Sequence, residues 1–298
     1  MPPAPSPGTL FVVATPIGNL EDITLRAIRV LREVALVAAE DTRRTSKLLN
    51  HLGIATRTVS LHEHNERART PGLIAQLQSG ESIALVTDAG TPLLSDPGRL
   101  FTSTAAAAGI RVEPVPGPSA LLAALAGAGV PWTQFAFLGF SPTKQSARRA
   151  FYTRAAALGL PFVIFEAPHR LRASLDDAAA LLGERDLVVC RELTKLHEEF
   201  VRTTTSAAPD LFRSREVIGE YTLLFGAPAS VPDVREALSD EGIWSELERL
   251  TAAGRTRREA IAELADREGR SSRDIYAAAE RGKAAARGAA AAESGLLS

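Results

Sequence analysis

Carboxylate and imidazole side chains stand beside several apolar runs of this chain, where they could transfer a proton. Glu40, Glu166 and Glu192 each end or follow such a run, His169 lies just beyond the second, and Glu220 precedes a later one. A carboxylate or imidazole held next to a reacting hydroxyl can accept its proton. The sequence does not rank these five residues as proton acceptors, and salt bridging is the alternative role for each.

Three apolar runs are followed by loops rich in proline, glycine and small hydroxyl residues, at 15–19, 88–92 and 116–120. Proline fixes φ, and glycine lets a ligand approach the backbone closely. Open α/β sheets bind ligands outside the carboxyl ends of their strands. Stiff loops also lose little entropy on binding. Any one loop could be an ordinary turn, but together the three predict a ligand site.

The first loop excludes a dinucleotide or nucleotide-triphosphate site of the usual kinds. Residues 14–19 hold one glycine and a proline, where a phosphate-binding loop needs several glycines and free backbone donors. The sequence also lacks a Walker-type loop. These absences favour a nucleoside ligand without a phosphate chain.

The loops and their neighbours carry a resemblance that runs from about Gly8 to Phe225. The chain resembles the tetrapyrrole methylase superfamily of class III S-adenosylmethionine-dependent methyltransferases, and within it the enzymes that methylate small-subunit ribosomal RNA. The segments that match are TPIGNL at 15–20, AEDTR at 39–43, DAGTP at 88–92, DPG at 96–98, PGP at 116–118, EAPHR at 166–170 and RELTK at 191–195.

The resemblance implies a cofactor, a reaction and a partner. The cofactor would be S-adenosylmethionine, and the reaction would methylate the ribose 2′-hydroxyl of one cytidine in the decoding region of 16S ribosomal RNA, within the 30S subunit. It also implies a homodimer. By resemblance, the residues that bind the cofactor are Pro16, Ile17, Gly90, Thr91, Leu94, Ser119, Ala120 and Glu166.

Two other functions remain open. A methylase of the same fold could act on a small tetrapyrrole precursor, although residues 89–92 read Ala-Gly-Thr-Pro where those enzymes typically have Gly-Asp-Pro. A DNA-binding regulator could use the C-terminal helices, which resemble a helix-turn-helix, but this leaves two enzyme-sized domains unexplained.

The net charge of about −1 hides two basic regions. Residues 141–174 hold six Lys or Arg against one acid, and residues 24–47 hold six against three. Clustered positive charge can bind phosphates, and solvated helix faces are the alternative. The residues predicted to contact RNA are Arg43, Arg44, Lys144, Arg148, Arg149, Arg170 and Lys195.

One cluster has metal-ligand residue types, and the chain has one cysteine. The run 62–66 reads His-Glu-His-Asn-Glu, but no second ligand cluster accompanies it. A structural or RNA-contacting loop is therefore favoured, and no metal is predicted. Cys190 lies in an apolar run, so we expect a buried thiol and no disulfide. A cytoplasmic setting fits, since the chain has no signal peptide or apolar stretch long enough for a membrane span.

The pattern of runs predicts two tandem α/β domains followed by a small helical domain. Short apolar runs alternate with helical patterns of about ten residues, which is typical of mostly parallel sheets with helices on both faces. The expected division is a disordered leader at 1–8, an N-terminal α/β domain at 9–116, a second α/β domain at 117–227, and a linker, helical domain and disordered tail at 228–298.

The same pattern gives the expected elements. Two late strands, 199–202 and 221–225, are expected to form an antiparallel edge of the second domain. The other strands are expected at 10–14, 35–39, 58–61, 82–87, 111–115, 135–140, 162–165 and 187–191. Helices are expected at 24–32, 42–52, 71–78, 98–108, 120–128, 146–158, 171–182, 246–252, 258–267 and 272–280.

Overall fold

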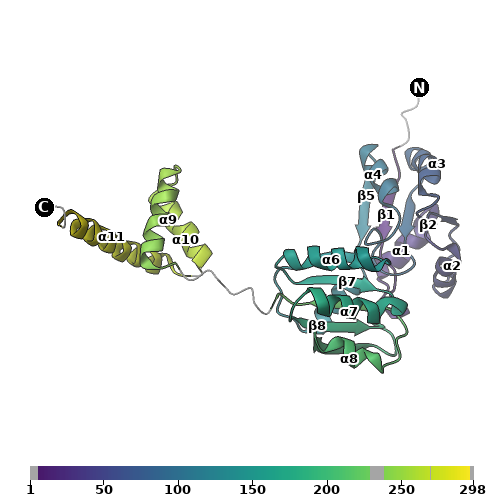
Figure 1. Ribbon diagram of the computed structural model, residues 1–298. Helices are drawn as coiled ribbons and strands as arrows, with labels where there is room; N and C mark the ends of the chain where they lie inside the picture. Colours follow the sequence, from purple (N-terminus) through teal and green to yellow (C-terminus); the bar gives the residue numbers. More distant parts are fainter. Residues whose placement is uncertain (1–5, 229–237, 269, 296–298) are drawn as a thin grey trace. The chain divides into compact units, whose positions relative to one another are not determined.

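The computed structural model describes residues 6–228, 238–268 and 270–295 (Figure 1). The chain divides into two compact units, Met1–Ala229 and Ser230–Ser298. Of the expected leader, residues 1–5 lie outside the described residues, as do 229–237 of the expected linker. The first strand begins at Thr9.

The N-terminal part of the first unit is built on a five-stranded parallel sheet. Its strand order is β3-β2-β4-β1-β5, and each neighbouring pair is parallel. The two strands β2 and β4 are buried along their whole length, as their apolar runs predict. The strands are β1 (Thr9–Val13), β2 (Leu36–Ala39), β3 (Thr58–Ser60), β4 (Ile83–Val86) and β5 (Arg111–Val115).

Helices cover both faces of this sheet. On one face α1 (Leu25–Glu33) and α2 (Thr42–His51) bury apolar side chains against alternate strand residues. On the other face α3 (Glu66–Gln78) and α4 (Arg99–Ala107) do the same. The α/β class predicted from the sequence is therefore confirmed. All strands of the sheet must end at one edge, so the loops after them converge there.

Helix α3 begins at Glu66, five residues before the expected start at Pro71. Proline at the first helical position is common, so a start at Pro71 is compatible with the sequence. In the structure Pro71 lies inside the helix, and the preceding turn is held by side chains instead. Thr70 Oγ1 donates to the Glu66 carbonyl at 2.8 Å, and Asn65 Oδ1 accepts from His62 N at 2.9 Å.

The second part of the first unit is a mixed five-stranded sheet of order β6-β7-β10-β8-β9. The strand β9 lies at the edge and is antiparallel to β8, as predicted. The prediction that β10 also lies at the edge is wrong, because β10 pairs antiparallel with both β7 and β8. The strands are β6 (Ala136–Phe140), β7 (Phe162–Glu166), β8 (Asp186–Arg191), β9 (Glu199–Thr204) and β10 (Tyr221–Phe225).

The central position of β10 follows from its composition. All five of its residues are buried, and a strand that is buried on both faces needs a neighbour on each side to satisfy its backbone. Three short helices were not predicted, and in two of them a proline stands in the first turn. They are η1 (Leu20–Asp22), η2 (Pro168–Arg170) and α8 (Ala208–Arg213).

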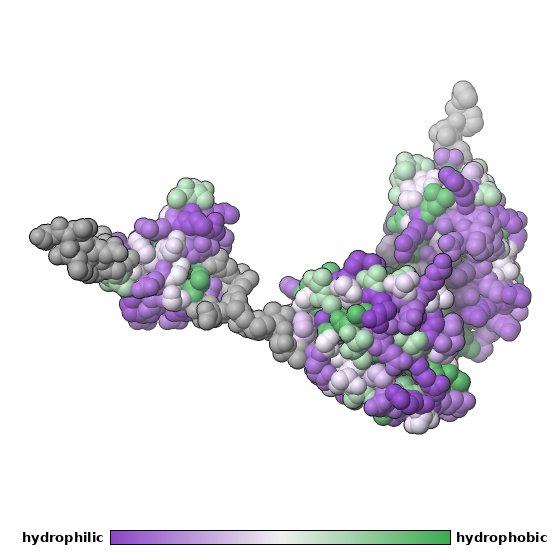
Figure 2. Space-filling model, in the orientation of Figure 1, coloured by the Kyte–Doolittle hydropathy of each residue, from purple (hydrophilic) through white to green (hydrophobic). Residues whose placement is uncertain are grey.

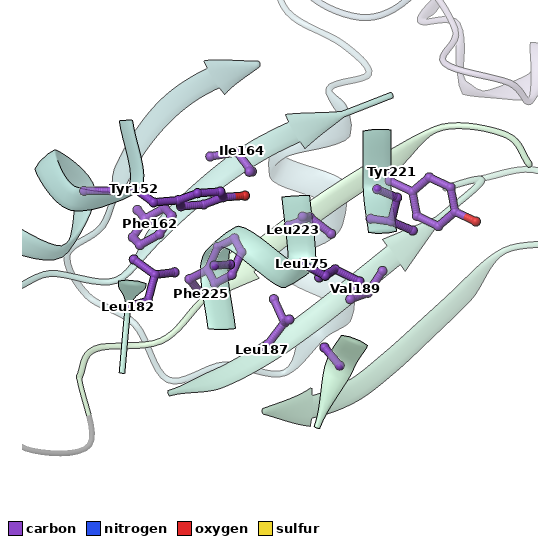
Figure 3. Close-up of a cluster of buried hydrophobic side chains, with 14 of the residues drawn as sticks. Tyr152, Phe162, Ile164, Leu175, Leu182, Leu187, Val189, Tyr221, Leu223 and Phe225 are labelled. Atoms are coloured by element: carbon purple, nitrogen blue, oxygen red, sulfur yellow. The ribbon is translucent and has the colours of Figure 1, made fainter. Parts of the chain in front are cut away.

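A cluster of aromatic and aliphatic side chains fills one face of the second sheet (Figure 3). It is covered by α6 (Gln145–Ala157), α7 (Leu171–Leu181) and α8. At its centre the rings of Phe162 and Phe225 stack with centroids 4.7 Å apart. The buried hydroxyl of Tyr152 finds a partner in Ser174 Oγ at 2.6 Å.

The opposite face of the second sheet joins the two parts of this unit. Helix α5 (Ala120–Ala128) packs on β8 and β10, and Ile17, from the loop after β1, is buried in the same cluster. The predicted buried thiol of Cys190 is confirmed here, and burial raises its pKa to about 12. This packing brings the strand-end loops of the first sheet against the second sheet.

The C-terminal unit packs three helices around a small apolar core (Figure 1). They are α9 (Asp240–Ala252), α10 (Arg257–Glu268) and α11 (Ser272–Gly295). A Cβ at Gly282 would lie 2.0 Å from the carbonyl oxygen of Asp240, so glycine is needed where α11 crosses α9. The expected disordered tail after Lys283 is instead helical to Gly295. Alanine, which dominates this segment, has the highest helix propensity.

Figure 2 shows the hydropathy of the residues on one face of the molecule. Hydrophilic residues predominate there, with smaller apolar patches between them. No helix in the described parts of the chain combines the length and apolar character that crossing a membrane requires.

Arg148 is not available for RNA, contrary to the prediction from the sequence. Its side chain is about 5% exposed, and its Nε donates to Asp177 Oδ2 at 2.8 Å. Arg149, one residue on, is 46% exposed and reaches the other oxygen of Asp177 at 3.1 Å. The helical period buries Arg148 and leaves Arg149 near the surface. The sequence pattern did not reveal that Asp177 is a buried acid that pairs with Arg148.

This pair of arginines yields a stability prediction. Arg148→Leu should lower the free energy of unfolding by about 3 kcal/mol, because it leaves Asp177 buried with only one partner. Arg149→Leu, the matched control, should lower it by less than about 1 kcal/mol, since Arg149 is near the surface. Urea denaturation measures both values. Equal effects of the two substitutions would contradict this account.

Candidate active site

A cavity of about 470 Å³ lies where the strand-end loops of the first sheet face the second sheet. This volume is within the range of small-molecule sites. Residues of the first part that line it are Ile17, Glu40, Arg44, Thr87, Asp88, Ala89, Gly90, Thr91, Leu94, Ser95 and Asp96. Residues that follow the first sheet and line it are Ser119, Ala120, Phe140, Phe165, Glu166, Ala167, Pro168, Glu220, Tyr221 and Thr222.

The loops around the cavity are tied to one another by their backbones. Thr15 and Gly90 exchange two backbone hydrogen bonds of 2.9 Å, and Thr91 Oγ1 donates to the Pro118 carbonyl at 3.1 Å. Gly90 has φ +83°, where a side chain would be strained and would crowd Ile17. All three loops singled out from the sequence therefore meet, and they are held before any ligand arrives.

Seven of the eight predicted cofactor residues line this cavity: Ile17, Gly90, Thr91, Leu94, Ser119, Ala120 and Glu166. Pro16 does not, and it lines a smaller adjoining cavity of about 200 Å³ with Leu20, Thr45, Lys47 and Leu48. The two cavities share Arg44, Thr87 and Asp88. Their assignment to a cofactor stays a prediction, and the geometry fits it.

Two residues of the 91–96 loop have strained backbones. Leu93 has φ +77° and Ser95 has φ +70°, in the left-handed region that non-glycine residues rarely adopt. Such residues persist only where their surroundings hold them, and they cluster at functional sites. Here they flank Leu94 and direct the loop into the cavity.

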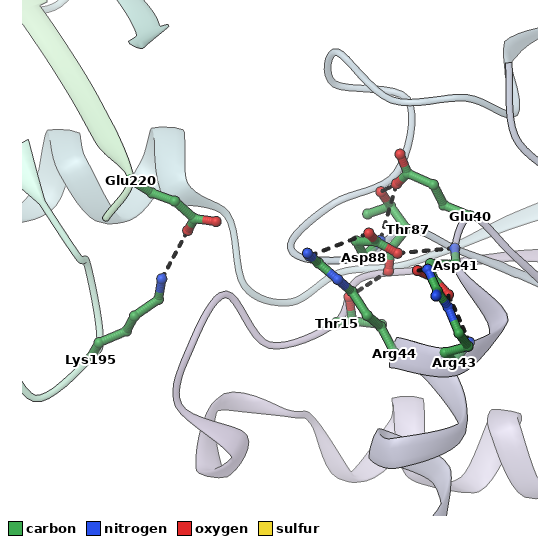
Figure 4. Close-up of polar contacts among 9 residues, drawn as sticks. All are labelled: Thr15, Glu40, Asp41, Arg43, Arg44, Thr87, Asp88, Lys195 and Glu220. Atoms are coloured by element: carbon green, nitrogen blue, oxygen red, sulfur yellow. Dashed lines mark hydrogen bonds and ion pairs between the residues drawn. The ribbon is translucent and has the colours of Figure 1, made fainter. Parts of the chain in front are cut away.

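Three carboxylates of the first part line the cavity, and two of them, Glu40 and Asp88, follow the ends of β2 and β4 (Figure 4). Glu40 Oε2 accepts from Thr87 Oγ1 at 2.7 Å and from Asp88 N at 3.3 Å. Asp88 accepts from Asp41 N at 3.0 Å and lies 3.4 Å from a guanidinium nitrogen of Arg44. Asp96 is the third carboxylate. The negative charge at this wall exceeds the positive charge.

Burial and a neighbouring charge raise the pKa values of two of these acids, Asp96 and Asp88. Desolvation and, next, the charge of Glu40 raise the pKa of Asp96 to about 7. The same two causes, in the same order, raise the pKa of Asp88. Neither aspartate was among the proton acceptors named from the sequence. Asp96 stood in a Pro-Gly turn that supported the resemblance, and only folding shows that it shares a wall with Glu40.

Of the five residues named as proton acceptors, Glu166 is fully engaged by the fold. It is 2% exposed, and its carboxylate accepts from Ser141 Oγ and from Ala167 N. Arg170 Nε also lies 3.1 Å from Glu166 Oε1. Arg170 therefore neutralises a buried acid, and its side chain, about 15% exposed, contacts Thr143 rather than open solvent.

Glu192, Glu220 and Lys195 form one group (Figure 4 shows the last two). Lys195 Nζ donates to Glu192 Oε1 at 2.9 Å and to Glu220 Oε2 at 3.0 Å. Glu220 lines the cavity and Glu192 does not. The prediction that Lys195 contacts RNA is at odds with this pairing, because both carboxylates already occupy its ammonium group.

The remaining predicted residues lie near the cavity or apart from it. His169 is exposed on η2 and is not part of the cavity lining. Arg43 is 88% exposed and pairs with Asp41 at 2.8 Å. This contact lowers the pKa of Asp41 to about 2. Lys144 is exposed at the start of α6 and forms no ion pair with a described residue.

The run 62–66 is a structural turn. Asn65 Nδ2 contacts the Ser60 carbonyl and hydroxyl at 3.3 and 3.2 Å, and Glu66 Oε1 accepts from Phe101 N at 3.0 Å. Within the residues that the structure describes, no group of three or more His, Cys, Asp or Glu could hold a metal ion. The structural role favoured from the sequence fits these contacts.

The raised pKa of Asp96 gives a prediction for stability. The folded state holds the proton up to about pH 7, whereas the unfolded chain loses it near pH 4, so Asp96 lowers stability as pH rises between these values. Asp96→Asn should therefore stabilise the protein above pH 7 by about 1–2 kcal/mol, after allowance for partial exposure, and leave it unchanged near pH 4.

Thermal unfolding of the two proteins across pH 4–8 checks this. The expected rise in Tm at pH 8 is about 2–6 °C. Asp176→Asn, at an exposed position of α7, is the control and should not change Tm. A gain in stability that is the same at pH 4 and pH 8 would contradict the assignment.

Comparisons with known proteins agree with this architecture. Residues 9–209 match the model of the family Tetrapyrrole (Corrin/Porphyrin) Methylases. A uroporphyrin-III C-methyltransferase of Thermus thermophilus, solved with S-adenyl homocysteine, has a TM-score of 0.52 at 18% identity and covers 74% of this chain and 97% of its own. Diphthine synthase has a TM-score of 0.56 at 15% identity, over 74% and 90%. These likenesses show the fold.

Sequence relatives are closer. Ribosomal RNA small subunit methyltransferase I of Halalkalibacterium halodurans is 44% identical over 276 residues, which are 90% of this chain and 93% of the relative. Its counterpart in Synechocystis is 44% identical over 270 residues, 90% and 96% of the two chains. The chain therefore belongs to the tetrapyrrole (corrin/porphyrin) methylase family, within its ribosomal RNA small subunit methyltransferase I group.

Proposed function

We propose that this protein transfers a methyl group from S-adenosylmethionine to the ribose 2′-hydroxyl of a cytidine in 16S ribosomal RNA, and that the target is cytidine 1402. The observation that carries the proposal is the preformed cavity of about 470 Å³, walled by the three strand-end loops, in a chain with relatives of that name at 44% identity. The substrate would be the 30S subunit, and the enzyme would act in the cytoplasm as a homodimer.

The cavity suits this cofactor in shape and in charge. Ile17, Leu94 and Ala120 offer apolar contacts to a nucleoside, while backbone groups of the tied loops can recognise its polar edges. Three carboxylates at the other wall attract a sulfonium cation. S-adenosylmethionine, when bound, supplies an electrophilic methyl group.

The chain's own residues position the partners and handle a proton. Loops that are stiff before binding keep the reacting atoms aligned, which can contribute much of the rate acceleration. The pairing of Lys195 with Glu220 fixes one side of the cavity, and the Arg170–Glu166 pair fixes another. The carboxylates of the acidic wall are placed to accept a proton from a hydroxyl.

The competing small-molecule reaction fits the cavity less well. A tetrapyrrole precursor carries several carboxylates of its own, and the acidic wall formed by Glu40, Asp88 and Asp96 would repel them. A ribose hydroxyl and a cytosine amino group are hydrogen-bond donors, which such a wall attracts. The charge of the wall therefore favours a hydroxyl or amino group over a carboxylate at the place of reaction.

A DNA-binding role for the C-terminal helices has less support. These helices carry both signs of charge in pairs, such as Arg281 with Asp240 at 2.6 Å and Arg257 with Glu280 at 2.5 Å. Paired arginines present less free positive charge to a phosphate backbone.

The direct test is methylation of 30S subunits from cells that lack the modification. Incubation with this protein and labelled S-adenosylmethionine should give one methylated cytidine, located by mass spectrometry of 16S RNA fragments and resistant to alkaline cleavage on its 3′ side. Methylation of a uroporphyrinogen with no label in RNA would instead favour the small-molecule reaction.

Cofactor binding in the cavity is tested by Thr91→Arg. The large charged side chain should fill the space beside Ser119 and Ala120 and reduce affinity for S-adenosylmethionine by about 100-fold or more, as measured by calorimetry. Thr153→Arg, the same change at an exposed site on α6, should leave affinity unchanged. Full affinity in a folded Thr91→Arg protein would place the cofactor elsewhere.

The RNA-binding role of α6 now depends on Lys144 and Arg149, since Arg148 is buried. Replacing both by glutamine should weaken 30S binding and reduce the slope of log K against log salt by up to about two, one for each phosphate contact. The matched control replaces Arg57 and Arg111, which stand at the amino-terminal ends of β3 and β5, away from the cavity edge. An equal loss in both double variants would indicate a general charge effect.

A further inference from the structure

We propose that Asp96 is the residue that accepts the proton of the ribose 2′-hydroxyl during methyl transfer. The inference rests on the proposed function and names the base that it requires. Asp96 was not among the residues that the sequence suggested. Asp96 differs from the other carboxylates that line the cavity in its contacts and in its electrostatic surroundings.

Glu166 and Glu220 are engaged by cations of the second part. Glu166 is buried, accepts from Ser141 and Ala167, and pairs with Arg170. Its carboxylate is therefore held by contacts within the fold. Glu220 accepts from Lys195 at 3.0 Å, and its side chain is 70% exposed. The charge of Glu220 is therefore already paired with the ammonium group of Lys195.

Glu40 and Asp88 are engaged by donors of the first part. Glu40 Oε2 accepts both the Thr87 hydroxyl and the Asp88 amide. Asp88 accepts from the Asp41 amide and faces Arg44. These contacts hold the two side chains in place. Their negative charge then acts on the third carboxylate of the wall.

Asp96 forms no ion pair with a described residue, and its hydrogen-bond donor is the Thr87 hydroxyl. Asp96 shares that hydroxyl with Glu40 Oε2, which accepts from Thr87 Oγ1 at 2.7 Å. Arg99 is the nearest cation, and its guanidinium donates twice to the Leu93 carbonyl, at 3.2 and 3.1 Å. Asp96 therefore lines the cavity without a paired cation, on a loop in which Leu93 and Ser95 have left-handed backbones.

The electrostatic surroundings of Asp96 suit a residue that accepts a proton. Desolvation and the charge of Glu40 bring the pKa of Asp96 to about 7, near the pH at which the enzyme must work. The charged groups that face it are Glu40 at the end of β2, Asp88 at the end of β4, Arg99 on α4 and, around the cavity, Arg44, Glu166 and Glu220.

The step balances in atoms and charge. The hydroxyl O–H bond breaks, and its proton passes to the Asp96 carboxylate. The oxygen forms a bond to the methyl carbon, while the carbon–sulfur bond breaks and its electron pair stays on sulfur. A carboxylate and a sulfonium thus become a carboxylic acid and a neutral thioether. Asp96 then returns its proton to water.

Single-turnover methylation of unmethylated 30S subunits across pH 5.5–8.5 tests the assignment. The wild-type rate should rise about tenfold per pH unit at low pH and level off near pH 7. Asp96→Asn should lower the rate by about 100-fold or more and abolish that inflection. Its affinity for S-adenosylhomocysteine, measured by calorimetry, should stay within about threefold of wild type.

A second variant tests the coupling within the acidic wall. Glu40→Gln removes the charge that raises the pKa of Asp96, so the rate should level off at a lower pH than in the wild type. A purely structural role for Asp96 predicts no such shift. Asp176→Asn is the control for both variants. Asp96→Ser, which also lacks a carboxylate, replaces the asparagine variant if the latter unfolds.

The outcomes separate this inference from the function on which it rests. A wild-type protein that binds S-adenosylhomocysteine but leaves 30S subunits unmethylated overturns the proposed function, and the assignment of Asp96 with it. An active wild type with an Asp96→Asn rate within tenfold, or with the inflection retained, overturns the role of Asp96 alone.

Discussion

The site depends on one packing interaction, the burial of Ile17 with α5 against the second sheet. This apolar contact joins the loop after β1 to β8 and β10, and therefore sets the strand ends of the first sheet against the second. The backbone bonds between Thr15 and Gly90 extend the contact to the loop after β4. Burying such a set of apolar side chains contributes several kcal/mol, enough to hold polar loops that would not pack by themselves.

That stable frame allows an arrangement of charge that is unfavourable in itself. Three carboxylates share one wall, and among them only Asp88 has a guanidinium close by, Arg44 at 3.4 Å. Two other buried carboxylates among the described residues are neutralised by cations. Asp177 pairs with two arginines, and Glu166 pairs with one arginine and accepts two further hydrogen bonds. The contrast separates acids that stabilise the fold from acids that the cavity keeps reactive. Residues with strongly shifted pKa values in a cleft are characteristic of functional sites.

Much of this could be predicted from the sequence, because the relevant signals are local. Apolar runs and helical spacing located the strands and most helices, and proline and glycine marked the loops that meet at the cavity. The predictions that were wrong concern features that depend on contacts between residues far apart in the sequence. The central place of β10 follows from strand pairing 30 or more residues away, with β8 and β7. Arg148 and Lys195 looked like free cations until Asp177 and the pair Glu192 and Glu220 came close in space. Asp96 gave no local signal at all.

Counting basic residues along the chain does not locate an RNA-binding surface, because many of these residues pair with carboxylates in the folded protein. A guanidinium is useful to the fold wherever a carboxylate must be buried, so a basic helix such as α6 divides its arginines between the interior and the solvent. Phosphate binding requires cations that are not already neutralised. Lys144 meets that condition among the described residues, and Arg149 meets it in part, because half of its side chain remains exposed beside Asp177. The surface that binds RNA therefore depends on the Lys and Arg side chains that are not already paired with carboxylates. These are fewer than the basic residues counted in the sequence.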